Sequence, residues 1–225
     1  MPPQGAARPP LAPSLPVAPP PDGRTAARAF LEVLDRVEPV AEAACRQQRP
    51  DLNCDFLILV DNDASKAPNA FQTLEPQTGR PVIGFTLSLI AEARSADELA
   101  FVLGHEAGHH IAGHLPRQKQ SAAAGAVLLG VIAALGGADA AVVENASQIG
   151  ASVGARRYSQ DYELEADSLG TLIAWRAGYN PEAGAAFFSR LPDPGNSFLG
   201  SHPPNAARMQ RVTATLEAIR SGRLR

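Results

Sequence analysis

Apolar residues recur at spacings of three and four in two stretches of the chain, a pattern typical of amphipathic helices. The first stretch covers residues 24–46 and the second covers residues 204–220. Residues 159–177 and 181–191 are also expected to be helical, because Gly178 suits the end of the first and an Asn-Pro pair suits the start of the second. The pattern therefore predicts a mostly helical protein.

Three short apolar runs predict β-strands, at residues 56–60, 70–74 and 81–86. The Pro and Gly of EPQTGR separate the second run from the third and favour a turn there. Strands followed by a long series of helices indicate the α+β class. We expect a mostly helical α+β fold with a small antiparallel or mixed sheet.

A further helix is predicted from its cap. Ser95-Ala-Asp-Glu98 is a capping box, in which a hydroxyl precedes a carboxylate by three residues. The helix should start near Ala96, and it must end before Pro116 because proline cannot continue it.

This helix carries His105-Glu106-Ala-Gly-His109, an HExxH pattern. Residues four apart lie on one face, so the two imidazoles converge on a point where they can bind one Zn²⁺. Glu106 projects beside them and can reach a metal-bound water. The pattern predicts a catalytic zinc site.

A catalytic zinc takes three protein ligands, so a third ligand is expected elsewhere. Glu163 and Asp167 share one face of the predicted helix 159–177. Glu163 is the expected ligand, and Asp167 is expected to accept a hydrogen bond from the other nitrogen of a ligand histidine. Glu165 is the rival ligand, two residues off that face.

Four other residues are candidates for supporting roles. His202, before the last helix, could donate a hydrogen bond to an oxyanion or close the vacant zinc position. Arg208, six residues later, could pair with a ligand carboxylate or the oxyanion. His110 and His114 are expected to pack or support the site, because His110 points elsewhere and His114 lies a turn further on, beyond easy reach of the metal.

Residues 120–138 contain no charged side chain, which raises the question of a membrane segment. The apolar run is shorter than the ~20 residues of a spanning helix, and Ala and Gly contribute little transfer free energy. We expect a soluble helix packed closely on its neighbours, with a membrane-dipping segment as the alternative.

The first 22 residues contain nine of the twenty prolines and lack the charged and apolar regions of an intact secretory signal. They predict an extended tether, which suits attachment to a membrane anchor or a lost leader. Residues 23–225 are expected to form one domain.

Composition narrows the function classes. The chain has 225 residues, a net charge of −3 and 45% hydrophobic residues, which is typical of a soluble domain. Its scattered Lys and Arg form no basic stretch, which excludes nucleic acid as an expected partner. Cys45 and Cys54 could close a small disulfide loop or remain as two thiols, and a disulfide would indicate an oxidising compartment.

The motifs HEAGHHIAGH, YELEADSLG and SHPPNAARM, in this order, closely resemble metallopeptidase family 48. The likeness covers most of residues 25–222 and is strongest to the compact, soluble periplasmic branch, which has no repeat array. It implies zinc ligands at His105, His109 and Glu163, a general base at Glu106, and functional roles for His202 and Arg208. It also implies a gluzincin-type fold with the edge of a small sheet beside the HExxH helix.

Together these features predict a zinc endopeptidase of the bacterial periplasm or another extracytoplasmic site, acting on misfolded or envelope proteins. Zinc would activate a water molecule, with Glu106 as the base. An extended substrate is expected to pair with the edge of the strand at residues 81–86. The alternative is a zinc-containing, chaperone-like domain that binds unfolded envelope proteins without cutting them. The sequence indicates no oligomeric state.

Overall fold

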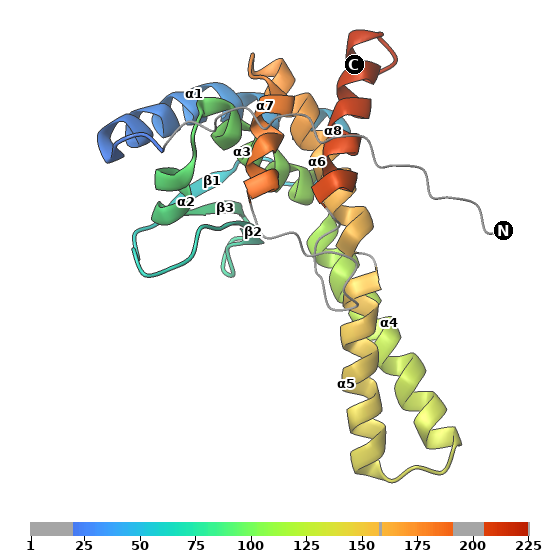
Figure 1. Cartoon of the computed structure of the whole chain (residues 1–225). Helices are drawn as coiled ribbons and strands as arrows, with labels where there is room; N and C mark the ends of the chain where they lie inside the picture. The colour runs from blue at the N-terminus through green and yellow to red at the C-terminus, as the bar shows by residue number, and fades with distance from the viewer. Residues whose placement is uncertain (1–19, 158, 191–204, 225) are drawn as a thin grey trace, which may run out of the picture.

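The computed structural model describes residues 20–157, 159–190 and 205–224. Its helices and a small sheet confirm the predicted mostly helical α+β class (Figure 1). The elements, in chain order, are α1 (Gly23–Gln48), β1 (Leu57–Asp61), β2 (Ala70–Leu74), β3 (Pro81–Thr86), α2 (Leu87–Glu92), α3 (Ala96–Ile111), α4 (His114–Leu135), α5 (Ala140–Arg157), α6 (Ser159–Arg176), α7 (Pro181–Ala185), the 3-10 helix η1 (Ala186–Arg190) and α8 (Asn205–Arg220).

The sheet is mixed, with strand order β1-β3-β2. β3 pairs in parallel with β1 and antiparallel with β2, so it is the central strand and all six of its residues are buried. The expectation that residues 81–86 offer an edge to a substrate was therefore wrong. A buried apolar run is typical of a central strand, and β2 forms the edge that contacts α3.

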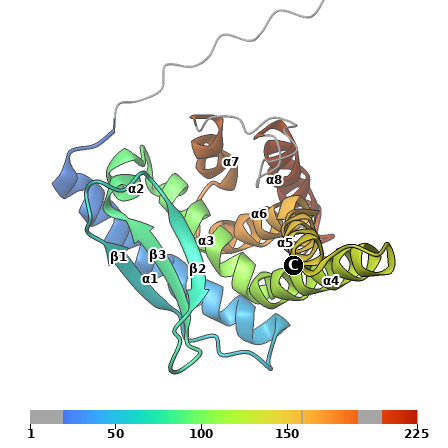
Figure 2. The same ribbon diagram turned by 90° about the horizontal axis from the view of Figure 1, so that it is seen from below.

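The core lies between the sheet and the helices that cover it. α1 crosses the sheet (Figure 2), where Phe30 packs edge-on against Phe85 of β3 with ring centroids 5.0 Å apart. α3 is almost completely buried next to it, including Leu99, Phe101 and Leu103. A disulfide joins Cys45 in the last turn of α1 to Cys54 before β1, and both residues are buried in this core.

α3 begins where the capping box predicts. The side chain of Ser95 accepts a hydrogen bond from the backbone N–H of Glu98. The carboxylate of Glu98 accepts the N–H of Arg94, one residue before the expected partner, and forms an ion pair with Arg190. This pair links the start of α3 to η1.

The chain turns sharply after α3. The helix ends at Ile111, and Gly113 adopts a left-handed conformation with φ 68°, which a residue without a Cβ tolerates best. α4 then starts at His114 and takes Pro116 in its first turn, where the missing N–H costs no helical hydrogen bond. The break changes the direction of the chain immediately after the HExxH motif.

Small residues let α3 and α6 approach closely. A Cβ added at Gly170 of α6 would lie 2.8 Å from the backbone nitrogen of His105, and one at Gly108 would lie 3.0 Å from the carbonyl oxygen of Ala166. Only glycine fits such a contact without shifting the backbone. The close crossing brings the carboxylates of α6 within reach of the histidines of α3.

α4 and α5 form a helical hairpin that projects away from the rest of the molecule (Figure 1). Each helix packs mainly on the other, and α4 has only His114 and Gly130 buried. The expectation of a helix packed closely on its neighbours was wrong, because α4 packs mainly on α5 alone. With a single packing partner, the outer side of α4 stays uncovered.

Candidate metal centre

The two histidines of α3 and Glu163 of α6 converge on one point. The Nε2 atoms of His105 and His109 are 3.0 Å apart, and the carboxylate oxygens of Glu163 lie 3.5 Å from the first and 3.4 Å from the second. Ligands about 2.1 Å from a shared ion at a tetrahedral angle lie about 3.4 Å apart. The three side chains could thus hold one metal ion between them.

A buried ion pair holds the first histidine. The Nδ1 of His105 donates to Oδ1 of Asp167 at 2.9 Å, and Arg208 of α8 binds both oxygens of the same carboxylate at 2.9 and 2.6 Å. Asp167 is completely buried and Arg208 is 5% exposed. Arg208 also lies 3.6 Å from Glu163 and covers the ring of Phe188 at 3.4 Å. Its charge therefore offsets the two carboxylates next to the histidines.

The charges around His105 favour a positive group in the site. Burial alone would lower the pKa of His105, but the hydrogen bonds to Asp167 and Glu163 outweigh it and raise the pKa to about 9. Burial also works to raise the pKa of Asp167, but the bonds from Arg208 and His105 hold it below its ordinary value. Both carboxylates thus stabilise a cation at the position of the imidazole.

A second chain of hydrogen bonds supports His109. Its Nδ1 lies 2.8 Å from Nδ1 of His114, whose Nε2 lies 3.1 Å from Glu165. Glu165 in turn forms an ion pair with Arg117 at 2.8 Å. Burial and the neighbouring His109 lower the pKa of His114 to about 4, against the effect of Glu165. A neutral His114 can accept the proton of His109 Nδ1 and donate its own to Glu165, which leaves His109 Nε2 free for a metal.

His114 was expected only to pack or to support the site, and the sequence did not predict its partners. Glu165 was expected as the rival ligand, but the structure places Glu165 on His114 and Arg117. His110 points elsewhere, with its Nε2 2.8 Å from the carbonyl oxygen of Asn53. Gly113 was the available signal, because a glycine can adopt the left-handed conformation that ends one helix before the next begins.

A cavity of about 170 Å³ opens beside the metal-binding group, and Glu106 and His109 line it together with Gln72 of β2 and Tyr162 of α6. Tyr162 stacks on the ring of His114, with centroids 4.5 Å apart. Glu106 is buried at the wall of this cavity, next to the ligands in sequence. The arrangement places a carboxylate where a water molecule could be held beside a metal.

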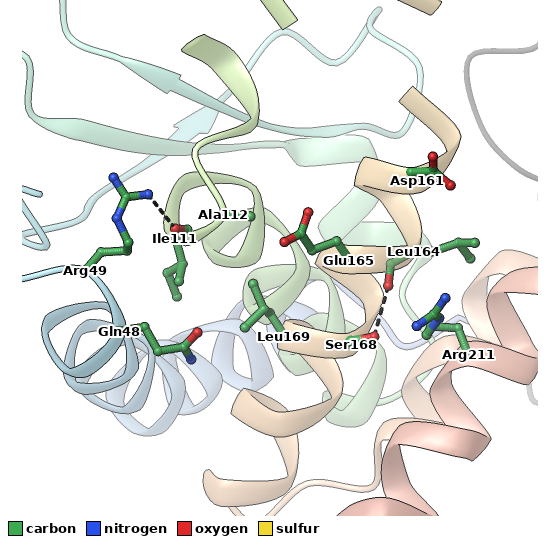
Figure 3. Close-up of a pocket in the computed structure, with 10 residues that line it drawn as sticks. All are labelled: Gln48, Arg49, Ile111, Ala112, Asp161, Leu164, Glu165, Ser168, Leu169 and Arg211. Atoms are coloured by element: carbon green, nitrogen blue, oxygen red, sulfur yellow. Dashed lines mark hydrogen bonds between the residues drawn. The ribbon is translucent and has the colours of Figure 1, made fainter. Parts of the chain in front are cut away.

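A larger cavity of about 550 Å³ is lined by residues from the ends of α1 and α3 and from α6 and α8 (Figure 3). Arg49, Glu165 and Arg211 line it, and the dashed contacts are those of Arg49 to the carbonyl of Ile111 and of Ser168 to the carbonyl of Leu164. It is lined by none of the residues of the metal-binding group, which are His105, His109 and Glu163, and not by Glu106. The metal-binding group and Glu106 therefore lie at the smaller of these two cavities.

The structure brings together most of the residues that the sequence predicts for the site. His105, Glu106, His109, Glu163, Asp167 and Arg208 lie within one cluster of contacts and cavity walls. Arg208 pairs with Asp167 and lies near Glu163. His202 lies outside the described residues, so both of its expected roles remain predictions.

Comparison with known proteins gives two findings. The family model described as peptidase family M48 matches residues 30–216. A protein of Vibrio cholerae named as a beta-barrel assembly-enhancing protease is 34% identical over 115 residues, which cover 47% of this chain and 23% of that protein. The chain thus matches less than a quarter of this relative's length.

Proposed function

Because this chain belongs to peptidase family M48 and is a metallopeptidase, we propose that it is a zinc-dependent endopeptidase with Glu106 as its general base. The observation that supports this most is the meeting of His105, His109 and Glu163 within 4.8 Å beside a cavity that Glu106 lines. A binding domain without catalysis has no need for a buried carboxylate at that position.

The donor set favours zinc among the common metals. Two imidazole nitrogens and one carboxylate are the ligands of catalytic zinc sites, which leave one position for water or substrate. Calcium and magnesium prefer sets of oxygen ligands at larger coordination numbers. When bound, the ion would polarise the scissile carbonyl and lower the pKa of a water molecule.

The side chains of the protein then transfer the proton and orient the two histidines. Glu106 accepts a proton from the attacking water and delivers it to the nitrogen of the leaving amine. Asp167 and Arg208 fix the ring of His105, while His114 and Glu165 fix that of His109. These bonds keep both Nε2 atoms directed at one point during the reaction.

Strand β2 is the proposed docking edge for the substrate. It is an edge of the sheet, it contacts α3, and its residue Gln72 lines the cavity with Glu106. An extended peptide could add to this edge through main-chain hydrogen bonds, which recognise no particular side chain. A complex with a peptide analogue should show these bonds, and a peptide bound without pairing to β2 would contradict the proposal.

We further propose that the protein works in the bacterial envelope on misfolded or envelope proteins. The disulfide between Cys45 and Cys54 suits an oxidising compartment. The name of the Vibrio cholerae relative concerns the assembly of beta-barrels, and residues 1–22 have the composition of a tether. The domain would then act close to a membrane.

Cleavage of an unfolded substrate with and without a chelator tests the function. The protein should contain one zinc per chain, digest casein, lose this activity after chelation and recover it when zinc is added. A protein that binds zinc and prevents aggregation of an unfolded protein but cuts nothing would instead support the chaperone-like alternative.

A further inference from the structure

The outer surface of the α4–α5 hairpin is unusually apolar. α4 exposes five large aliphatic side chains, and the last of these, Leu135 at the tip, is 85% exposed. Val142 and Ile149 of α5 are exposed as well. We call this surface the hairpin face; it consists of Val127, Leu128, Val131, Ile132, Leu135, Val142 and Ile149.

The contact between the two helices is made by small residues instead. A Cβ on Gly150 of α5 would lie 2.1 Å from the carbonyl oxygen of Gly125, and one on Gly130 of α4 would meet Ser147. Helices in water bury their large apolar residues and expose small or polar ones. This hairpin instead buries small residues between its helices and exposes large apolar ones, as helices that pack in lipid do.

The charges along the hairpin agree with a lipid environment. Residues 120–138 carry none, while Lys119 lies exposed at the base, where it could meet anionic headgroups. Within the described residues, α4 alone is long and apolar enough to cross a membrane. On α5, however, Glu144 and Gln148 are exposed and joined by a hydrogen bond.

We propose that the hairpin face inserts into the apolar layer of a lipid bilayer. The hairpin lies within one leaflet and does not cross, because crossing would carry Glu144 and Gln148 through the hydrocarbon. A second copy of the chain is a poorer occupant, since protein interfaces have a polar rim and paired helices use flanking charges to set their register. On the α4 side of the face, residues 120–138 offer no charged side chain for this purpose.

This interaction would hold the metal centre near the membrane surface. α4 begins at His114, which contacts His109, so the base of the hairpin adjoins the site. Membrane binding is independent of the proposed peptidase activity and can be measured without it. The inference therefore goes beyond the proposed function.

Flotation of the full chain with vesicles of phosphatidylethanolamine and phosphatidylglycerol tests the proposal. The triple variant Leu128→Gln, Val131→Gln, Leu135→Gln removes apolar surface from one side of α4, and glutamine keeps its helix propensity. The wild type should float with the vesicles. The vesicle-bound fraction of the triple variant should be lower than that of the wild type by about tenfold or more. The control Leu31→Gln, Leu87→Gln changes exposed leucines far from the hairpin and should bind like the wild type.

Depth can be measured by fluorescence after Trp175→Phe removes the single tryptophan. Leu135→Trp should shift to the blue and be quenched by brominated acyl chains, whereas Leu31→Trp should show neither effect. Circular dichroism and zinc content check that each variant is folded. The proposal is overturned if the wild type does not float or if the triple variant floats equally well. It is also overturned if light scattering shows that the wild type is a dimer and the triple variant a monomer, and if neither protein binds vesicles.

Discussion

The Nδ1 atom of His114 lies 2.8 Å from the Nδ1 atom of His109, although the two residues belong to different helices. The contact directs His109 Nε2 at the point that it shares with His105 and Glu163. Glu165 fixes the ring of His114 from its other side. The position of one proposed ligand thus depends on the turn that separates α3 from α4.

Removal of this support should weaken metal binding. We expect His114→Ala to raise the dissociation constant for zinc about 10- to 100-fold, because the partner of a ligand histidine fixes its orientation and basicity. Competition with a chelator measures the constant, and the visible spectrum of the cobalt-substituted protein should change. His110→Ala is the control, since the ring of His110 is hydrogen-bonded to the backbone carbonyl of Asn53 and not to a residue of the metal-binding group. Equal zinc affinity in both variants would contradict the role of His114.

Asp167→Asn should affect both stability and metal binding. Arg208 would lose its paired charge in a buried position, which costs about 3–5 kcal/mol of unfolding free energy. Urea denaturation of the metal-free protein measures this loss, and zinc affinity should fall as well. Asp55→Asn breaks an exposed pair with Arg80 and should change stability little. If both variants unfold at the same urea concentration as the wild type, Asp167 has no such role.

The close crossing of α3 and α6 should not tolerate an added methyl group. Gly170→Ala places a Cβ 2.8 Å from the backbone nitrogen of His105, so the helices must separate. We expect a loss of about 1–3 kcal/mol in unfolding free energy. Zinc affinity should also fall, because Glu163 moves with α6. Gly23→Ala has open space around its Cβ and provides the control; unchanged zinc affinity in Gly170→Ala would contradict the argument.

Local signals were sufficient to predict much of the fold and site. The Ser95 cap and the HExxH spacing depend on neighbours within a few residues, and helix geometry then places His105 and His109 on one face. On a continuous helix His114 would point away from His109. It reaches His109 because the chain turns at Gly113 and a new helix starts at His114, a tertiary consequence that helical periodicity does not contain.

Two other expectations failed for related reasons. The order of strands in a sheet depends on which segments meet in space, so the central place of β3 could not be derived from its own residues. Composition showed that α4 is apolar, but its exposure depends on how many elements pack on it. In both cases the missing information was which elements pack against the segment in space.

The disulfide should contribute to stability. Its loop is short, with a sequence separation of 9, and closing such a loop stabilises by about 2–3 kcal/mol in the chain-entropy account. Urea denaturation with and without reductant measures the difference. The double variant Cys45→Ser, Cys54→Ser should be insensitive to reductant. Two free thiols in protein isolated from its native compartment would contradict the oxidising location.

The most direct measurement is the cleavage rate of unfolded casein by Glu106→Gln, taken together with its zinc content. Glutamine keeps the size of the side chain but cannot accept a proton from water. The account predicts one zinc per chain and no cleavage above background, whereas the wild type cuts at a zinc-dependent rate. A variant that holds zinc and cleaves as fast as the wild type would contradict the central claim.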